Sequence, residues 1–85
     1  MNELETYSKI TVENGGRFIL LDNNNDYGLY KVQTWKLVYN SYFGDTPVYQ
    51  IYRYDDGKRI YTTISLDLAY KFYNDLINGD KERWY

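Results

Sequence analysis

Asp22, Asn24 and Asp26 come nearest to a known chemistry, that of a calcium-binding loop. They have the one, three, five spacing with which an EF-hand loop begins. Such a loop also needs glycine at its sixth position and glutamate at its twelfth, where this chain has Tyr27 and Gln33. We therefore interpret the segment as a polar turn, and we expect no metal site in the chain.

Groups suited to catalysis are scarce, because the sequence contains no cysteine and no histidine. This removes thiolate nucleophiles, the imidazole base, disulfides and zinc fingers, and leaves carboxylates, lysines and tyrosines. Asp55 and Asp56 are adjacent carboxylates, but with Gly57 they form a sequence typical of a hairpin turn rather than of two acids facing across a cleft. Gly15-Gly16 lacks the lysine and the following helix of a phosphate-binding loop. We expect no catalytic residues, no cofactor and no enzyme activity.

Tyrosine is the residue type that most clearly indicates a function, because the chain has 12 tyrosines and 3 phenylalanines. A tyrosine brings a flat ring and a hydroxyl into a contact at a low cost in side-chain entropy, and it recurs on recognition surfaces. A bias toward AT-rich codons would raise the number of tyrosines, but it would raise phenylalanine equally. Composition and sheet propensity stay open as alternatives, and the predicted kind of function is binding.

Length and charge narrow the kinds of protein further. Eighty-five residues, 44% of them hydrophobic, predict one domain over residues 1–85, with residues 1–8 as a candidate disordered segment and residues 80–85 as a tail. The longest apolar run, residues 18–21, is far shorter than a membrane span, and the polar first residues are unlike a signal peptide. We therefore expect a cytoplasmic protein. A net charge of −2 suits neither a general nucleic-acid binder nor a strongly acidic mimic of DNA.

The elements that must position a site are predicted from period-two alternation and from turn residues. Strands are predicted in residues 9–13, 17–22, a stretch within 29–42, 48–54 and 58–64, with hairpin turns at Asn14-Gly15-Gly16 and at Asp55-Asp56-Gly57. The unbroken apolar run predicts that the second of these strands is central or covered on both faces.

A helix is predicted at the C-terminal end of the sheet segments. Ser65 has the residue type of a helix N-cap, apolar residues follow at helical spacing up to Ile77, and Asn78-Gly79 is a suitable stop. The predicted fold is α+β, an antiparallel meander of four to five strands with one C-terminal amphipathic helix packed on one face.

The candidate binding site follows from one assumption about register. If Asp56-Gly57 is a two-residue turn, Tyr54 pairs with Arg59 on the facing strand. Continuing this pairing places an aromatic and basic group of side chains on the sheet face opposite the helix, where it would be exposed. The predicted partner-binding residues are Tyr52, Tyr54, Arg59, Tyr61 and Lys36. The residues predicted to lie under the helix are Tyr49, Ile51, Ile60 and Ile64. A slip of one residue would invert both sets.

A strand hairpin over residues 48–64 and an amphipathic helix over residues 65–77, in a small acidic chain without cysteine, resemble small phage-encoded inhibitors such as the anti-CRISPR proteins. The resemblance covers roughly the last 40 residues and is one of architecture, so it carries over no functional residue. It implies a non-catalytic protein-binding module, a stoichiometric inhibitor of a bacterial defence nuclease such as a CRISPR effector, in the host-cell cytoplasm. Two alternatives stay open: a single-stranded nucleic-acid-binding protein that uses the aromatic and basic sheet face, and a homodimeric structural or regulatory phage protein.

Overall fold

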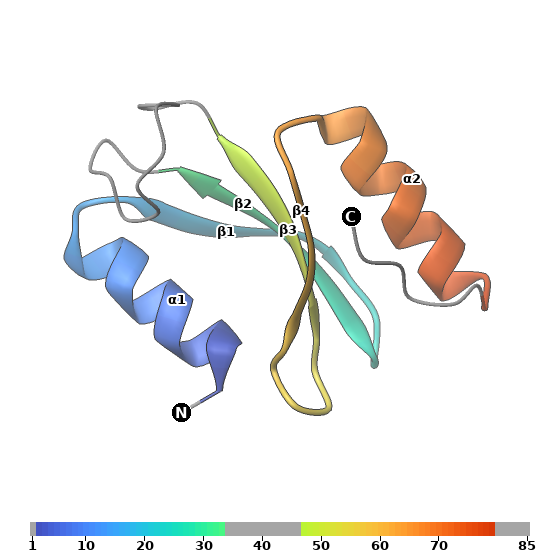
Figure 1. Ribbon diagram of the computed structural model, residues 1–85, viewed down its shortest axis with the longest axis horizontal. Coiled ribbons are helices and arrows are strands. Elements are labelled where there is room, and N and C mark those ends of the chain that lie inside the picture. The colour runs from blue at the N-terminus through green and yellow to red at the C-terminus, as the bar shows by residue number, and fades with distance from the viewer. Residues whose placement is uncertain (1, 34–46, 80–85) are drawn as a thin grey trace.

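Two helices and a four-stranded antiparallel sheet make up the α+β fold of this chain in a computed structural model, which describes residues 2–33 and 47–79 (Figure 1). The elements are α1 (Glu3–Glu13), β1 (Arg17–Asn23), β2 (Tyr27–Gln33), β3 (Val48–Arg53), β4 (Arg59–Thr63) and α2 (Leu66–Ile77). Neighbouring strands in the chain are neighbours in the sheet, so the predicted antiparallel meander with a C-terminal helix is confirmed. Neither described helix has the length and apolarity needed to cross a membrane.

Helix α1 occupies the segment for which we predicted the first strand, so that prediction is wrong. The helix also takes in residues 3–8 of the candidate disordered segment, residues 1–8. Asn2 caps it, because its Oδ1 accepts a hydrogen bond from the N–H of Glu5 at 2.9 Å. Glu3 and Glu5 then place negative charge in the first turn, where it stabilises the positive end of the helix dipole.

Asn14, Gly15 and Gly16 end helix α1 and do not form the predicted hairpin turn. Gly15 has a φ of +80°. Its N–H donates to the carbonyl of Val12 at 3.0 Å, and the N–H of Gly16 donates to the carbonyl of Thr11 at 2.9 Å. This pair of bonds is the Schellman motif of helix C-termini. A helix stop and a hairpin turn both need a residue that tolerates positive φ, so the same tripeptide suits either.

Strand β1 lies at an edge of the described sheet, although its apolar run predicted a strand that is central or covered on both faces. It pairs with β2, and a register shift between Leu20 and Asp22 interrupts that ladder. Ile19 and Leu20 are 38% and 48% exposed. The alternating residues 34–42, which we expected to continue the next strand, lie outside the described part of the chain.

Helix α2 and one face of the sheet form the hydrophobic core. Ser65 caps the helix as predicted, because its Oγ accepts a hydrogen bond from the N–H of Leu68 at 3.2 Å. Ala69 and Tyr73 of α2 are 0% and 1% exposed. They belong to one buried cluster with the sheet residues Leu29, Tyr49, Ile51, Ile60 and Tyr61. Ile64, predicted to lie beneath the helix, is instead 55% exposed.

Helix α1 lies on the side of the sheet away from α2 (Figure 1). Tyr52 pairs with Arg59, and the guanidinium of Arg59 stands 4.6 Å from the ring centroid of Tyr7 in α1. Neighbouring residues of a strand point to opposite faces, so Tyr52 and its partner Arg59 lie on the face opposite that of Ile51, which belongs to the core cluster. The sheet therefore has a helix on each side, and the face predicted to be open carries α1.

Candidate functional site

The β3–β4 hairpin does not have the register on which the predicted site depends. Tyr52 pairs with Arg59, the residue for which we predicted Tyr54 as partner. The register then shifts, and Ile51 pairs with Tyr61. Since paired residues share a face, Tyr61 lies on the α2 face while Tyr52 lies on the α1 face. The prediction that Tyr52 and Tyr61 share one exposed face is wrong.

Tyr52 and Tyr61 are both core residues in this structure. Tyr61 is 9% exposed, and its ring centroid lies 4.4 Å from that of Phe72 in α2. Tyr52 is 0% exposed, and its hydroxyl donates a hydrogen bond to Oε1 of the buried Gln50 at 2.7 Å. Neither ring is accessible to a partner in the folded chain. Lys36, the fifth predicted residue, lies outside the described residues.

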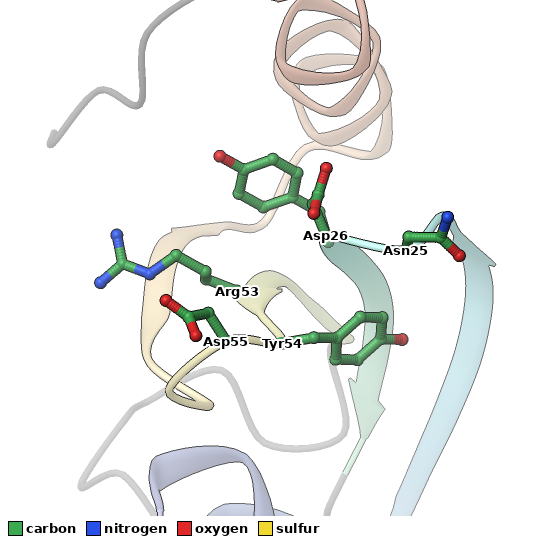
Figure 2. A pocket seen from close by; sticks show the side chains of 6 residues that line it. Asn25, Asp26, Arg53, Tyr54 and Asp55 are labelled. Carbon is green, nitrogen blue, oxygen red and sulfur yellow. The ribbon is translucent and has the colours of Figure 1, made fainter.

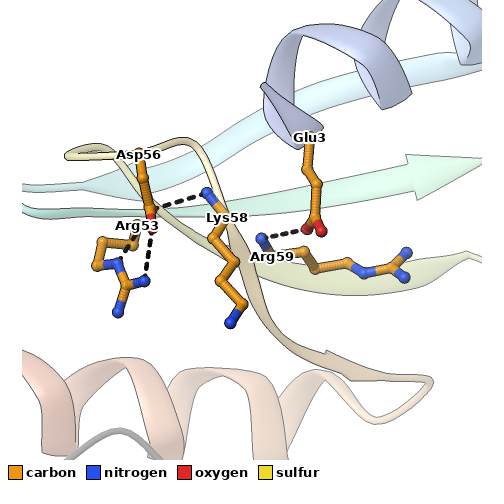
Figure 3. A network of polar contacts seen from close by, with 5 residues as sticks. All are labelled: Glu3, Arg53, Asp56, Lys58 and Arg59. Carbon is orange, nitrogen blue, oxygen red and sulfur yellow. Dashed lines mark hydrogen bonds and ion pairs between the residues drawn. The ribbon is translucent and has the colours of Figure 1, made fainter. Parts of the chain in front are cut away.

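Arg59 joins strand β4 to helix α1. Its backbone N–H donates to Oε2 of Glu3 at 2.8 Å (Figure 3), and its guanidinium stacks on Tyr7. Beside this contact the N–H of Leu4 donates to the carbonyl of Gly57 at 2.9 Å. The first turn of α1 is thus docked on the hairpin by polar contacts, and Arg59 takes part in that docking.

Tyr54 is the predicted site residue that stands at the loop end of the sheet. Its hydroxyl lies 2.9 Å from the hydroxyl of Tyr30 and accepts a hydrogen bond from Nδ2 of Asn23 at 3.3 Å. The hydroxyl end of its side chain lies over Gly28, where a Cβ would overlap it. Burial and the contact with Tyr54 raise the pKa of Tyr30 above its ordinary value. These three neighbours fix the position of the Tyr54 ring.

A pocket of about 490 Å³ opens beside Tyr54, between the β1–β2 turn and the β3–β4 hairpin (Figure 2). It is lined by Asn25, Asp26, Tyr27, Arg53, Tyr54 and Asp55, and this set is called the loop-end pocket below. The two loops are joined across it, because the N–H of Tyr54 donates to the carbonyl of Asp26 at 2.8 Å. Three lining residues are exposed and three, Tyr27, Arg53 and Tyr54, are half-buried.

The β1–β2 turn is held by its own polar side chains. Oδ1 of Asn24 accepts hydrogen bonds from the N–H of Asp26 at 2.9 Å and of Tyr27 at 2.7 Å. Oδ1 of Asp22 accepts one from the N–H of Asn23 at 2.8 Å. The segment with the calcium-like spacing is thus a turn in which asparagine and aspartate bond to the backbone. In the described part of the chain no group of three or more acidic, cysteine or histidine residues is arranged to hold a metal ion.

Comparison with protein families, curated proteins and solved structures gives no significant match. The chemistry of the loop-end pocket must therefore be derived from its own residues.

Arg53, the cation of the loop-end pocket, is paired with Asp56 (Figure 3). Its Nη2 and Nε lie 2.6 Å and 3.0 Å from the two carboxylate oxygens, a bidentate arrangement. The backbone N–H of Lys58 donates to the same carboxylate at 3.0 Å. Asp26 and Asp55, in contrast, form no ion pair with any residue that the structure describes. The pocket therefore has two unpaired carboxylates beside a neutralised arginine.

We predict that Asp56 titrates at a pH below its ordinary range. The hydrogen bond from Arg53 and that from the Lys58 backbone lower the pKa of Asp56 from 3.8 to about 2. Because the pKa is lower in the folded chain, the stabilisation from this pair is complete above pH 3.8 and is lost as the pH falls through about 2. A carbon-detected NMR titration of the carboxyl group would measure the midpoint.

Arg53→Met should move that midpoint back toward 3.8, whereas Arg17→Met, which removes an exposed arginine of β1, should leave it in place. A midpoint near 3.8 in the unsubstituted chain would show that the bidentate pair does not persist in solution.

The residues that line the loop-end pocket were missed by the sequence analysis, Tyr54 excepted. A usable signal was present, because in an antiparallel meander the first and third turns lie at the same end of the sheet. The turn at Asn23–Asp26 and the hairpin after Arg53 must therefore meet. The predicted site lay along the strands, whereas the pocket lies where these two turns meet.

Proposed function

We propose that this chain is a non-catalytic protein-binding domain and that the loop-end pocket is part of its contact surface. The observation that carries the proposal is the fixed position of the Tyr54 ring, set by the Tyr30 hydroxyl, Asn23 and Gly28. An aromatic side chain that is already held in place loses little conformational entropy when a partner packs on it. Tyrosine and arginine, which both line this pocket, are the residue types that most often dominate interface energies.

The exposure of the loop-end pocket favours a protein over a free small molecule. Asn25, Asp26 and Asp55 are exposed, whereas pockets for small ligands bury about 70–90% of the ligand surface. A side chain that projects from a protein suits this pocket better, because the interface around it supplies the remaining burial.

A second surface supports the same kind of function. Ile64, Leu66 and Leu68 follow one another closely at the junction of β4 and α2, and they are 55%, 42% and 44% exposed. A group of large exposed apolar side chains is a common feature of protein interaction surfaces. These residues lie at the opposite end of the sheet from the β3–β4 hairpin (Figure 1).

The partner that we propose is a bacterial defence nuclease such as a CRISPR effector, which the chain would inhibit stoichiometrically in the host-cell cytoplasm. This choice is supported by the resemblance to small phage-encoded inhibitors that the sequence of residues 48–77 suggested. Asp26 and Asp55, which form no ion pair with a described residue, add support, because an enzyme that binds nucleic acid carries arginine and lysine on its surface.

The proposal is tested by capturing proteins from nuclease-treated bacterial lysate on the immobilised chain and identifying them by mass spectrometry. Lys71→Ala, which alters the exposed side of α2, should capture as much of the partner as the unsubstituted chain does. Tyr54→Ala should capture at least about tenfold less of it, as expected for a hot-spot residue. Circular dichroism would establish that Tyr54→Ala is folded. Purified partner should then lose its nuclease activity at about one equivalent of the chain.

The protein-binding proposal fails if no protein is enriched over an inert bait. It also fails for this surface if Tyr54→Ala, shown to be folded, captures the partner as well as the unsubstituted chain does. A protein that is captured from untreated lysate but not from the nuclease-treated lysate would point instead to nucleic acid.

A further inference from the structure

We infer that the loop-end pocket takes a basic side chain of the partner, and specifically an arginine guanidinium. This inference rests on the proposed function, since it names the chemical group that a protein partner would insert. It is carried by three features of the pocket: two carboxylates that form no ion pair with a described residue, two tyrosines in the lining, and the backbone bonds that hold the two loops together.

The charges of the loop-end pocket select a cation. Asp26, Asp55 and Arg53 are its charged lining residues, and the guanidinium of Arg53 is already bonded by both oxygens of Asp56. An entering anion would meet two carboxylates and an arginine whose charge is compensated. An entering cation would meet the same carboxylates without having to displace an existing ion pair, because neither carboxylate has one with a described residue.

The aromatic lining selects a planar cation. Tyr27, which packs against the core cluster, and Tyr54, whose hydroxyl contacts Tyr30, are both lining residues of the pocket. A guanidinium stacks on a tyrosine ring while its N–H groups stay available at the edge. The same combination exists elsewhere in this chain, where Arg59 lies 4.6 Å from the ring centroid of Tyr7. The N–H fork of arginine also matches a carboxylate with two parallel hydrogen bonds, which a lysine ammonium cannot form.

The walls of the loop-end pocket are fixed before a partner arrives. The N–H of Tyr54 bonds to the carbonyl of Asp26 at 2.8 Å, and Asn24 holds the N–H groups of Asp26 and Tyr27. The Tyr54 hydroxyl is bonded at its far end by Tyr30. Binding therefore requires little rearrangement of the loops that carry the carboxylates.

The inference is tested by titrating the full chain, labelled with nitrogen-15, with N-acetyl-arginine amide at low salt. The backbone amides of Asp26, Tyr27, Tyr54 and Asp55 should shift and saturate, with a Kd on the order of 1 mM for so small a probe. The citrulline analogue has nearly the same shape but no charge, and it should bind at least fivefold more weakly. The lysine analogue should also bind more weakly than the arginine probe.

A matched pair of variants separates the pocket from the general charge of the surface. Asp26→Asn combined with Asp55→Asn should weaken binding of the arginine probe at least fivefold. Glu5→Gln combined with Asp67→Asn removes the same charge from exposed positions on the two helices and should leave the Kd unchanged. All four side chains are exposed, so the folded structure should be retained in both variants.

Four results would each overturn the inference: no saturable shift, shifts spread over the acidic surface, equal binding of the citrulline analogue, or an unchanged Kd in the pocket variant. Equal binding of the lysine analogue would overturn the choice of arginine. If the arginine probe fails while Tyr54→Ala still loses a captured protein, the chain binds proteins but not by a basic anchor. If the probe binds and no protein is ever captured, the proposed function fails while the pocket chemistry holds.

Discussion

Replacing Tyr52 with alanine is expected to lower the free energy of unfolding by about 3–5 kcal/mol, the range for removing a large aromatic side chain from a core. Tyr52 is 0% exposed. Its ring centroid lies 5.9 Å from that of Phe18 and 5.7 Å from that of Tyr30, in tilted and edge-to-face arrangements. Such ring pairs add to the effect of burial. Because small domains are stable by only about 5–15 kcal/mol, the loss should be easily seen in a urea titration followed by circular dichroism.

Tyr52→Phe is the matched control, because it keeps the ring and removes the hydroxyl that donates to Gln50. It leaves the buried Gln50 oxygen without this donor, which should cost about 1–3 kcal/mol, less than the alanine substitution. Equal urea midpoints for Tyr52→Ala and the unsubstituted chain would mean that the ring is exposed in solution. That result would restore the exposed face predicted from the sequence.

The C-terminal half of the fold was predictable because its signals are local. Strand β3 was expected over residues 48–54 and is Val48–Arg53, and β4 was expected over residues 58–64 and is Arg59–Thr63. The cap of α2 at Ser65 depends on one side chain and the backbone three residues ahead of it. Alternation, turn residues and caps are all visible within a few positions, so no tertiary contact was needed to place these elements.

Helix α1 was missed because its sequence has few apolar residues from which to judge a period. Ile10 and Val12 fit a strand pattern, yet Thr11 between them is the buried residue, which a strand pattern does not predict. Asn2 with two acids in the next three positions was the usable signal for a helix start. What the helix packs on is a tertiary property, so the covering of the second sheet face was not predictable from this segment alone.

The candidate site was misplaced because it depended on a register that the sequence does not determine. The hairpin turn is longer than the two residues assumed, and β4 contains a register shift opposite Ile51 and Tyr52. Either feature changes which residues share a face, since a slip of one residue inverts a strand. Tyr54 kept its place at the candidate site because it lies in the turn rather than in a paired strand, so the register error did not move it into the core.

Gly57→Ala is expected to lower the free energy of unfolding by about 2–5 kcal/mol and to loosen the docking of α1. Gly57 has a φ of +68°, where a residue with a Cβ costs about 1–2 kcal/mol. The added Cβ would also overlap the side chain of Asn2, the cap of α1, and overpacking of this kind typically costs about 1–3 kcal/mol. Urea denaturation would measure the total, and hydrogen exchange of the α1 amides would show where protection is lost.

A double-mutant cycle with Asn2→Gly separates the two causes. Glycine is nearly as good as asparagine at an N-cap, so Asn2→Gly alone should cost only a few tenths of a kcal/mol, and it removes the atoms that the new Cβ would overlap. In the double variant the overlap is absent, and about 1–2 kcal/mol of backbone strain should be left. Gly79→Ala provides an independent control, because Gly79 also has positive φ, +94°, but a Cβ there would meet no atom of the described residues within 4 Å. Strictly additive effects of the Gly57 and Asn2 substitutions would show that the Asn2 side chain does not lie against Gly57 in solution.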